Sequence, residues 1–168
     1  MSQQKTQSEM SEINKLQIGL FGKRNSGKSA LINALLGKDS VEVKETTEPI
    51  YKVMEINGIG PVTLVDTAGL DVSKAKQQTQ EAAQKIDAAL MIISNDSIEL
   101  ELAWINRLTR SGTVVIPVVS KIDKQPDKGK QLAAAVREAS GKIPVCVSAK
   151  QNIGIDELRS AIIEIVKK

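Results

Sequence analysis

Short apolar runs alternate with stretches of helical spacing along most of this chain, and this alternation limits the folds that it can adopt. The apolar runs are Leu16–Phe21, Tyr51–Ile56, Val62–Val65, Ala88–Ser94, Val114–Val119 and Val145–Val147. Helical spacing occurs in Lys28–Leu36, Lys74–Ile86, Ile98–Thr109, Lys128–Ala139 and Ile155–Val166. Strands that alternate with helices in this way form βαβ units. The chain therefore predicts a three-layer α/β/α fold with a six-stranded, mostly parallel sheet.

One junction departs from the alternation. Tyr51–Ile56 and Val62–Val65 are joined by Asn57–Pro61, which is rich in turn-forming residues and too short to hold a helix. Two strands joined by such a turn pair in antiparallel fashion. We therefore predict one antiparallel edge strand on the otherwise parallel sheet.

Length and composition favour a single domain with an aliphatic core. The chain has 168 residues, of which only Phe21, Tyr51 and Trp104 are aromatic. Residues 1–14 are polar and lack apolar periodicity, so we expect a flexible leader followed by one domain over residues 15–168.

Several classes of protein are excluded or disfavoured by composition. Cys146 is the only cysteine and there is no histidine, so this chain alone can form neither a disulfide framework nor a Cys/His metal centre. No apolar run approaches the length of a membrane span, and a net charge of +3 gives little attraction to anionic surfaces. A cytoplasmic protein with no membrane or nucleic-acid partner is expected.

The segment Gly22–Ser29, GKRNSGKS, matches the phosphate-binding pattern G-x-x-x-x-G-K-[ST] between a predicted strand and a predicted helix. Its glycines let the main chain turn so that successive N–H groups face phosphate oxygens, and the helix dipole favours the same anion. Lys28 is predicted to reach the β- and γ-phosphates, and the Ser29 hydroxyl to ligate Mg²⁺. The remaining predicted members of the phosphate cradle are Lys23, Arg24, Asn25, Ser26, Gly27 and Ala30.

An acidic residue follows the predicted strand that lies next to this loop. Asp66 begins the segment Asp66–Gly69, DTAG, directly after Val62–Val65. A carboxylate in that place can hold Mg²⁺ through water, and the N–H of Gly69 can contact a γ-phosphate.

Two later segments resemble the base-recognition elements of GTPases. In the first, Ser120–Asp123, the Asp123 carboxylate would accept two hydrogen bonds from guanine while the Lys121 stem packs over the ring. The family usually has asparagine where this chain has Ser120. The serine lacks the amide that bridges the base and the phosphate loop, so lowered guanine affinity is expected. The second segment is Ser148, Ala149 and Lys150, whose main-chain N–H groups would contact the guanine oxygen.

The resemblance to GTPases also assigns roles in hydrolysis. Thr46, with Thr47 as the alternative, would ligate Mg²⁺ and contact the γ-phosphate, so that Lys28, Thr46 and Gly69 form the predicted catalytic set. Leu70 stands where Ras-like enzymes place a water-orienting glutamine, which implies slow hydrolysis. Asn25 either ligates a K⁺ ion, as in GTPases resembling TrmE and Era, or only accommodates the turn.

Residues 15–166 resemble the TrmE–Era–EngA group of GTPases, with a Ras-like fold. Within that group, the segments Gly19–Leu35 and Thr46–Asp71 are similar to the GTPase domain of the hydrogenase maturation protein HydF. This resemblance implies a GTPase using GTP/GDP, Mg²⁺ and K⁺ that regulates assembly of a di-iron cluster. Its partners would be hydrogenase maturases or further domains of a parent chain. The alternatives are a non-hydrolysing switch, an Era-like RNA factor and, least favoured, an ATPase.

Overall fold

The structure is a computed structural model, and it describes the greater part of the predicted domain. The described residues are 16–23, 26–37, 50–56, 60–67, 84, 86–94, 97–124 and 126–167. The predicted leader and most of the predicted helix Lys74–Ile86 lie outside them. So do five predicted site residues, namely Arg24, Asn25, Thr46, Thr47 and Gly69.

Strands and helices alternate in the described chain as the sequence predicts. In chain order they are β1 (Gln17–Gly22), α2 (Lys28–Leu36), β2 (Ile50–Ile56), β3 (Gly60–Asp66), β4 (Ala88–Ile93), α4 (Glu99–Arg110), β5 (Val114–Val119), α5 (Pro126–Ser140), β6 (Val145–Cys146) and α6 (Ile155–Lys167). Helix α5 begins two residues before the predicted Lys128, because the fixed φ angle of a proline suits the first helical position. Strand β6 is one residue shorter than predicted.

The sheet confirms the predicted topology. Its strand order is β2-β3-β1-β4-β5-β6, and every neighbouring pair is parallel except β2 with β3. The central strands β1 and β4 are buried along their whole length, as expected of parallel strands covered on both faces. Because β1, β3, β4, β5 and β6 run in one direction, the loops that leave their carboxyl ends share one edge of the sheet.

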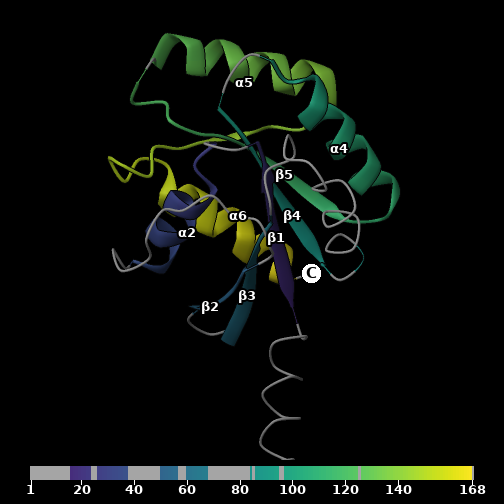
Figure 1. Ribbon diagram of the computed structural model, residues 1–168, viewed down its shortest axis with the longest axis vertical. Helices are drawn as coiled ribbons and strands as arrows, with labels where there is room; N and C mark the ends of the chain where they lie inside the picture. The colour runs from purple at the N-terminus through teal and green to yellow at the C-terminus, as the bar shows by residue number, and fades with distance from the viewer. Residues whose placement is uncertain are drawn as a thin grey trace, which may run out of the picture.

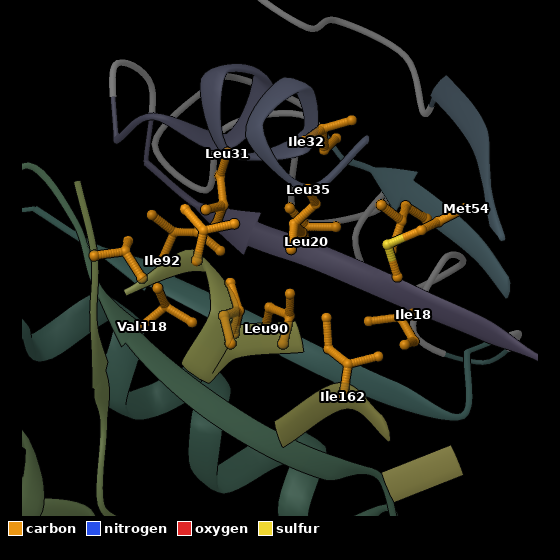
Figure 2. Close-up of a cluster of buried hydrophobic side chains, with 14 of the residues drawn as sticks. Ile18, Leu20, Leu31, Ile32, Leu35, Met54, Leu90, Ile92, Val118 and Ile162 are labelled. Atoms are coloured by element: carbon orange, nitrogen blue, oxygen red, sulfur yellow. The ribbon is translucent and has the colours of Figure 1, made fainter. Parts of the chain in front are cut away.

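Helices cover both faces of this sheet (Figure 1). Residues that alternate along β1 explain the arrangement, since Ile18 and Leu20 pack with α2 and α6, whereas Phe21 packs with α4 on the opposite face. Figure 2 shows the first cluster, in which Ile162 of α6 lies near the side chains of β1 and β4. The three layers are therefore held by two apolar clusters with the sheet between them.

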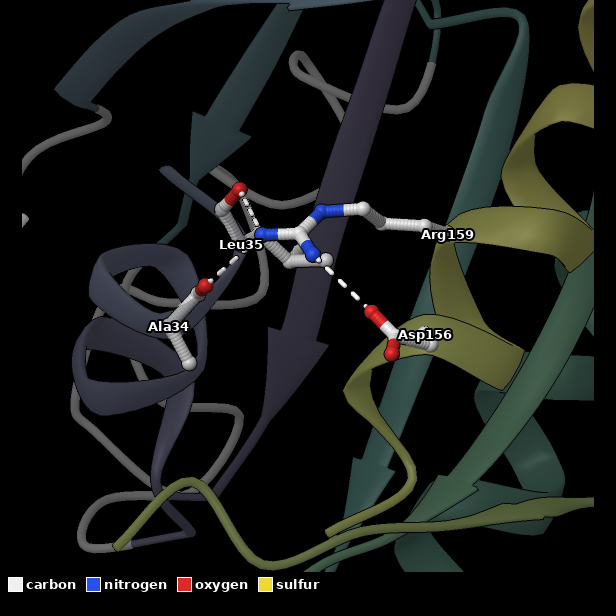
Figure 3. Close-up of polar contacts among 4 residues, drawn as sticks. All are labelled: Ala34, Leu35, Asp156 and Arg159. Carbon is white, nitrogen blue, oxygen red and sulfur yellow. Dashed lines mark hydrogen bonds and ion pairs between the residues drawn. The ribbon is translucent and has the colours of Figure 1, made fainter. Parts of the chain in front are cut away.

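Helices α2 and α6 are also joined by polar contacts (Figure 3). The guanidinium of Arg159 donates to the carbonyl oxygens of Ala34 and Leu35 at 3.1 and 2.8 Å. Carbonyls at the end of a helix have no partner within the helix, and a cation beside them also suits the helix dipole. Arg159 thus stabilises the end of the helix that follows the phosphate loop.

Candidate nucleotide-binding site

The predicted phosphate loop lies between β1 and α2, as its motif requires. Gly27 is the N-cap residue of α2 and has a left-handed conformation, with φ at 101°. Gly22 lies so close to β4 that a Cβ atom there would come within 2.7 Å of the Ile92 carbonyl oxygen. The helix therefore begins immediately after the loop, with its N–H groups and dipole available to an anion.

Lys28 lies within this loop and is only 7% exposed. Its Nζ donates to the carbonyl oxygens of Gly22 and Lys23, both at 3.1 Å. The loop therefore holds the ammonium group at the start of α2, where the sequence predicts contact with phosphates.

Ser29 and Asp66 meet in the structure as the predicted magnesium pair should. The Ser29 hydroxyl donates to Oδ2 of Asp66 at 3.0 Å, and Asp66 is 3% exposed. Both side chains offer oxygen atoms, which are the donors that Mg²⁺ prefers. A hydroxyl and a carboxylate beside a phosphate loop fit this ion, so these two residues are the ones that would hold it.

Ser120 connects the predicted base-recognition loop to the phosphate loop. Its Oγ donates to the carbonyl oxygen of Ser26 at 2.7 Å, and the residue is 8% exposed. Serine therefore keeps one half of the bridge, the contact with the phosphate loop, and lowered guanine affinity stays a prediction. A hydroxyl in this place is close enough to donate to the loop directly, and only the amide that would reach the base is missing.

Lys121 also lies against the phosphate loop. It has a left-handed conformation, with φ at 59°, and its Cε would be 3.7 Å from a Cβ atom added to Gly27. Burial lowers the pKa of Lys121, nearby Lys124 lowers it further, and Asp123 opposes both effects. The apolar stem thus lies beside the place where the sequence predicts a base.

Asp123 is held by the loop that follows β6. The Ser148 hydroxyl donates to Oδ1 of Asp123 at 2.7 Å, and Ser148 is fully buried. The same hydroxyl accepts a 3.1 Å hydrogen bond from the Gln151 N–H. The sequence predicts only main-chain contacts for Ser148, Ala149 and Lys150, so this orienting role of the Ser148 side chain is an addition.

Lys23 differs from its predicted place in the cradle. Its ammonium group lies 3.3 Å from Oε1 of Glu101 and also donates to the Ser97 carbonyl. A buried carboxylate holds the ammonium group, and the main chain of Lys23 remains available for the predicted cradle. Glu101 was not predicted, because an acidic residue in an amphipathic helix usually faces solvent.

Comparison with known proteins identifies this arrangement. A family model described as "50S ribosome-binding GTPase" matches residues 17–124, from β1 to the loop that contains Asp123. The chain belongs to this GTPase family. Membership agrees with the expected TrmE–Era–EngA resemblance at the level of the group.

Curated relatives and solved structures agree with the family. The chain is 32% identical to GTPase Der of Wolinella succinogenes and 30% identical to tRNA modification GTPase MnmE of Chromobacterium violaceum. These matches cover 89% and 90% of this chain but 36% and 35% of the relatives, so the chain spans about a third of their length. Era, solved with MgGDPNP and nucleotides 1506–1542 of 16S ribosomal RNA, matches with a TM-score of 0.76 at 22% identity, over 89% of this chain and 56% of Era.

Within the described part of the chain, no helix is both long and apolar enough to cross a membrane.

Proposed function

We propose that this chain binds GTP with Mg²⁺ and hydrolyses it to GDP. One observation supports this proposal most strongly. Lys28, the Ser29–Asp66 pair and the Asp123–Ser148 pair all lie at the edge of the sheet where the parallel strands end. A phosphate cradle, a magnesium pair and a base acceptor in that order suit a nucleoside triphosphate.

Catalysis in this site depends on positioning and charge. Lys28 contacts the β- and γ-phosphates, while the N–H groups at the start of α2 bind the same anion. Ser29 and Asp66 would hold Mg²⁺, which would supply positive charge at the phosphates. Thr46 or Thr47 and the N–H of Gly69 complete the contacts with the γ-phosphate. Leu70 has no group that can orient water, so turnover is slow.

Guanine is the proposed base. The Asp123 carboxylate accepts from its N1–H and 2-amino groups, a donor pair that adenine lacks. Ser148 keeps the carboxylate in place through the 2.7 Å hydrogen bond, and Lys121 covers the ring with its apolar stem.

A substitution in the cradle tests the proposal. Lys28→Ala removes the buried ammonium group, so calorimetric titration with GTP and Mg²⁺ should show at least about a hundredfold loss of affinity. Lys128→Ala is the matched control, because Lys128 is an exposed lysine of α5 with no assigned contact to the nucleotide. Wild-type protein that binds neither GTP nor GDP contradicts the function itself.

Asn25 supports a narrower proposal, that K⁺ accelerates hydrolysis. An amide oxygen in the phosphate loop can hold this ion between phosphates, where it adds positive charge. Single-turnover cleavage of GTP should then be faster in potassium chloride than in sodium chloride. Cleavage in neither salt, together with intact binding, would leave a non-hydrolysing switch as the function.

The cellular role is proposed at two levels. Der, MnmE and Era are the reported relatives, and the Era structure contains ribosomal RNA, so the expected absence of a nucleic-acid partner is not retained. RNA binding that weakens steeply with salt would support an Era-like role.

A role in hydrogenase cluster assembly, with maturases as protein partners and a cytoplasmic location, rests on the HydF resemblance alone. Capture of a purified maturase only in the GTP-bound state would support it.

A further inference from the structure

Lys23 belongs to the phosphate loop by sequence, yet its side chain is bound to helix α4. Its Nζ lies 3.3 Å from Oε1 of Glu101 and donates to the carbonyl oxygen of Ser97, just before the helix. Two groups that belong to α4 or adjoin it therefore hold the tip of this side chain.

Glu101 is an unusual place for a negative charge, since it is 1% exposed. Burial raises the pKa of its carboxyl group, while a main-chain hydrogen bond and Lys23 lower it and Glu99 raises it slightly further. A carboxylate out of water is costly unless a cation and hydrogen bonds compensate it. The Lys23 ammonium group and the amino end of α4 provide this compensation.

The helix that carries Glu101 is fixed in the core. Trp104, Ile105 and Leu108 of α4 are at most 5% exposed and pack with Phe21 of β1 in the second apolar cluster. Packed side chains of this kind have little freedom to move. Glu101 is thus a rigid anchor for whatever it binds.

The main chain of Lys23 takes part in the hydrogen bonds within the phosphate loop. Its carbonyl oxygen accepts hydrogen bonds from Nζ of Lys28 at 3.1 Å and from the Ser26 N–H at 3.2 Å. When the tip of the Lys23 side chain is held by α4, rotation of this peptide group is restricted. The carbonyl that orients the Lys28 ammonium group is then restricted with it.

We propose that Glu101 is a positioning residue for nucleotide binding, which acts through Lys23 to hold the phosphate loop and Lys28 in their binding geometry. This inference rests on the proposed GTP-binding function. It also implies that the charge of Lys23 pairs with Glu101 inside the protein. Lys23 then orders the loop but contributes little direct attraction to the phosphates.

The test compares variants of the full chain by titration with GDP and Mg²⁺ at a temperature well below their unfolding midpoints. Glu101→Gln keeps the size of the side chain and removes its charge, and we expect roughly tenfold weaker binding. Lys23→Arg keeps a cation that can reach the same carboxylate and should retain affinity within about threefold. Glu99→Gln is the control, because Glu99 lies in the same turn of α4 but is exposed.

A double variant, Lys23→Met with Glu101→Gln, leaves no buried charge unpaired and decides the question if Glu101→Gln fails to fold. Its effect should equal that of Glu101→Gln, because the two residues act as one unit. Affinity within about twofold of wild type in either Glu101→Gln or the double variant would overturn the inference. Tighter binding by Glu101→Gln, in which Lys23 is released from its partner, would overturn it as well. A purely structural role would lower the unfolding midpoint and leave the affinity of the folded protein unchanged. Wild-type protein that binds no nucleotide would instead refute the proposed function, before any variant is compared.

Discussion

The hydroxyl of Ser148 donates a 2.7 Å hydrogen bond to Oδ1 of Asp123, which joins the loop after β6 to the loop after β5. A second contact holds these loops together, since the Ile122 N–H donates to the Val147 carbonyl oxygen at 3.3 Å. The carboxylate assigned to the base is therefore oriented by another part of the fold before any ligand binds. Such preorganisation reduces the entropy lost on binding.

Removal of this hydroxyl should weaken guanine recognition. Ser148→Ala leaves the Asp123 carboxylate without its orienting donor, and a hydrogen bond to a charged group is worth about 1.5–3 kcal/mol. We expect GDP affinity to fall by about tenfold and the preference for GTP over ATP to narrow. Competition of both nucleotides against a fluorescent GDP analogue measures the two effects. Ser160→Ala, on the exposed side of α6, should change neither, and an unaltered Ser148→Ala variant would contradict the orienting role.

The Ser29–Asp66 pair predicts a specific dependence on magnesium. Asp66→Asn removes the charge that would hold the ion, so the Mg²⁺ concentration required for half-maximal GTP binding should rise by about tenfold or more. With a Mg²⁺ chelator present, the GTP affinity of Asp66→Asn should differ little from that of wild type, because Lys28 and the loop amides remain. Asp127→Asn, at the exposed first turn of α5, is the control. If Asp66→Asn loses the same GTP affinity with and without Mg²⁺, Asp66 has no role in holding the metal.

Arg159 and Asp156 are neighbouring charged residues of α6, and they should differ in how much they stabilise the fold. Arg159→Ala removes the charged donor from the Leu35 carbonyl and leaves the Ala34 carbonyl with only the Gly37 N–H, so the free energy of unfolding should fall by about 1.5–3 kcal/mol. Asp156→Ala removes only an ion pair whose acidic side chain is 95% exposed, so it should change stability by at most about 0.5 kcal/mol. Urea denaturation of both variants provides the comparison, and similar losses would show that the helix-end contacts contribute little.

Two glycines of nearly equal conformation form a matched pair. Gly154 and Gly141 have φ angles of 74° and 73°. A Cβ atom on Gly154 would lie 2.0 Å from the Cys146 carbonyl oxygen, whereas one on Gly141 would meet no atom within 4 Å. Gly141→Ala should therefore cost about 1 kcal/mol from conformation alone, and Gly154→Ala at least about 2 kcal/mol more. Thermal unfolding of the two variants measures the difference, and equal melting temperatures would refute the close approach.

Cys146 predicts a loss of stability in alkali. Burial raises the pKa of its thiol above 9.0, the ordinary value. The unfolded chain then releases this proton at a lower pH than the folded chain, so stability declines as the pH rises above 9.0 and levels off above the folded pKa. Cys146→Ala should lose less stability than wild type between about pH 8 and pH 10. Urea denaturation at both values gives the result, and parallel losses would contradict it.

Much of the fold could be predicted because its signals are local. The six strands and the helices after β1, β4, β5 and β6 follow from apolar runs and helical spacing. The antiparallel pair follows from a connection between Ile56 and Gly60 that is too short to hold a helix. Lys28, Ser29 and Asp66 could be singled out for a related reason. Each stands directly at the end of a strand or the start of a helix, where a parallel sheet brings functional residues together.

The contacts that orient those residues could not be predicted, because they depend on which loops become neighbours. Ser120 and Ser26 are 94 residues apart, and only the finished sheet shows that a hydroxyl at Ser120 reaches the phosphate loop. Glu101 has the spacing of the buried face of α4, since Trp104, Ile105 and Leu108 follow it by three, four and seven residues, but its charge favours a position in solvent. Its burial follows from the position of α4 against β4 and β5, together with a cation that extends from Lys23.

The contact of Arg159 with Ala34 and Leu35 spans 125 and 124 residues, so it also concerns the order in which the molecule matures. During synthesis α2 leaves the ribosome well before α6, because α6 follows it in the chain. The end of α2 therefore gains this side-chain contact late. We expect a nascent chain stalled before Ile155 to have its central strands assembled while the nucleotide pocket is still loose, so that emergence of α6 from the ribosome makes the pocket competent to bind.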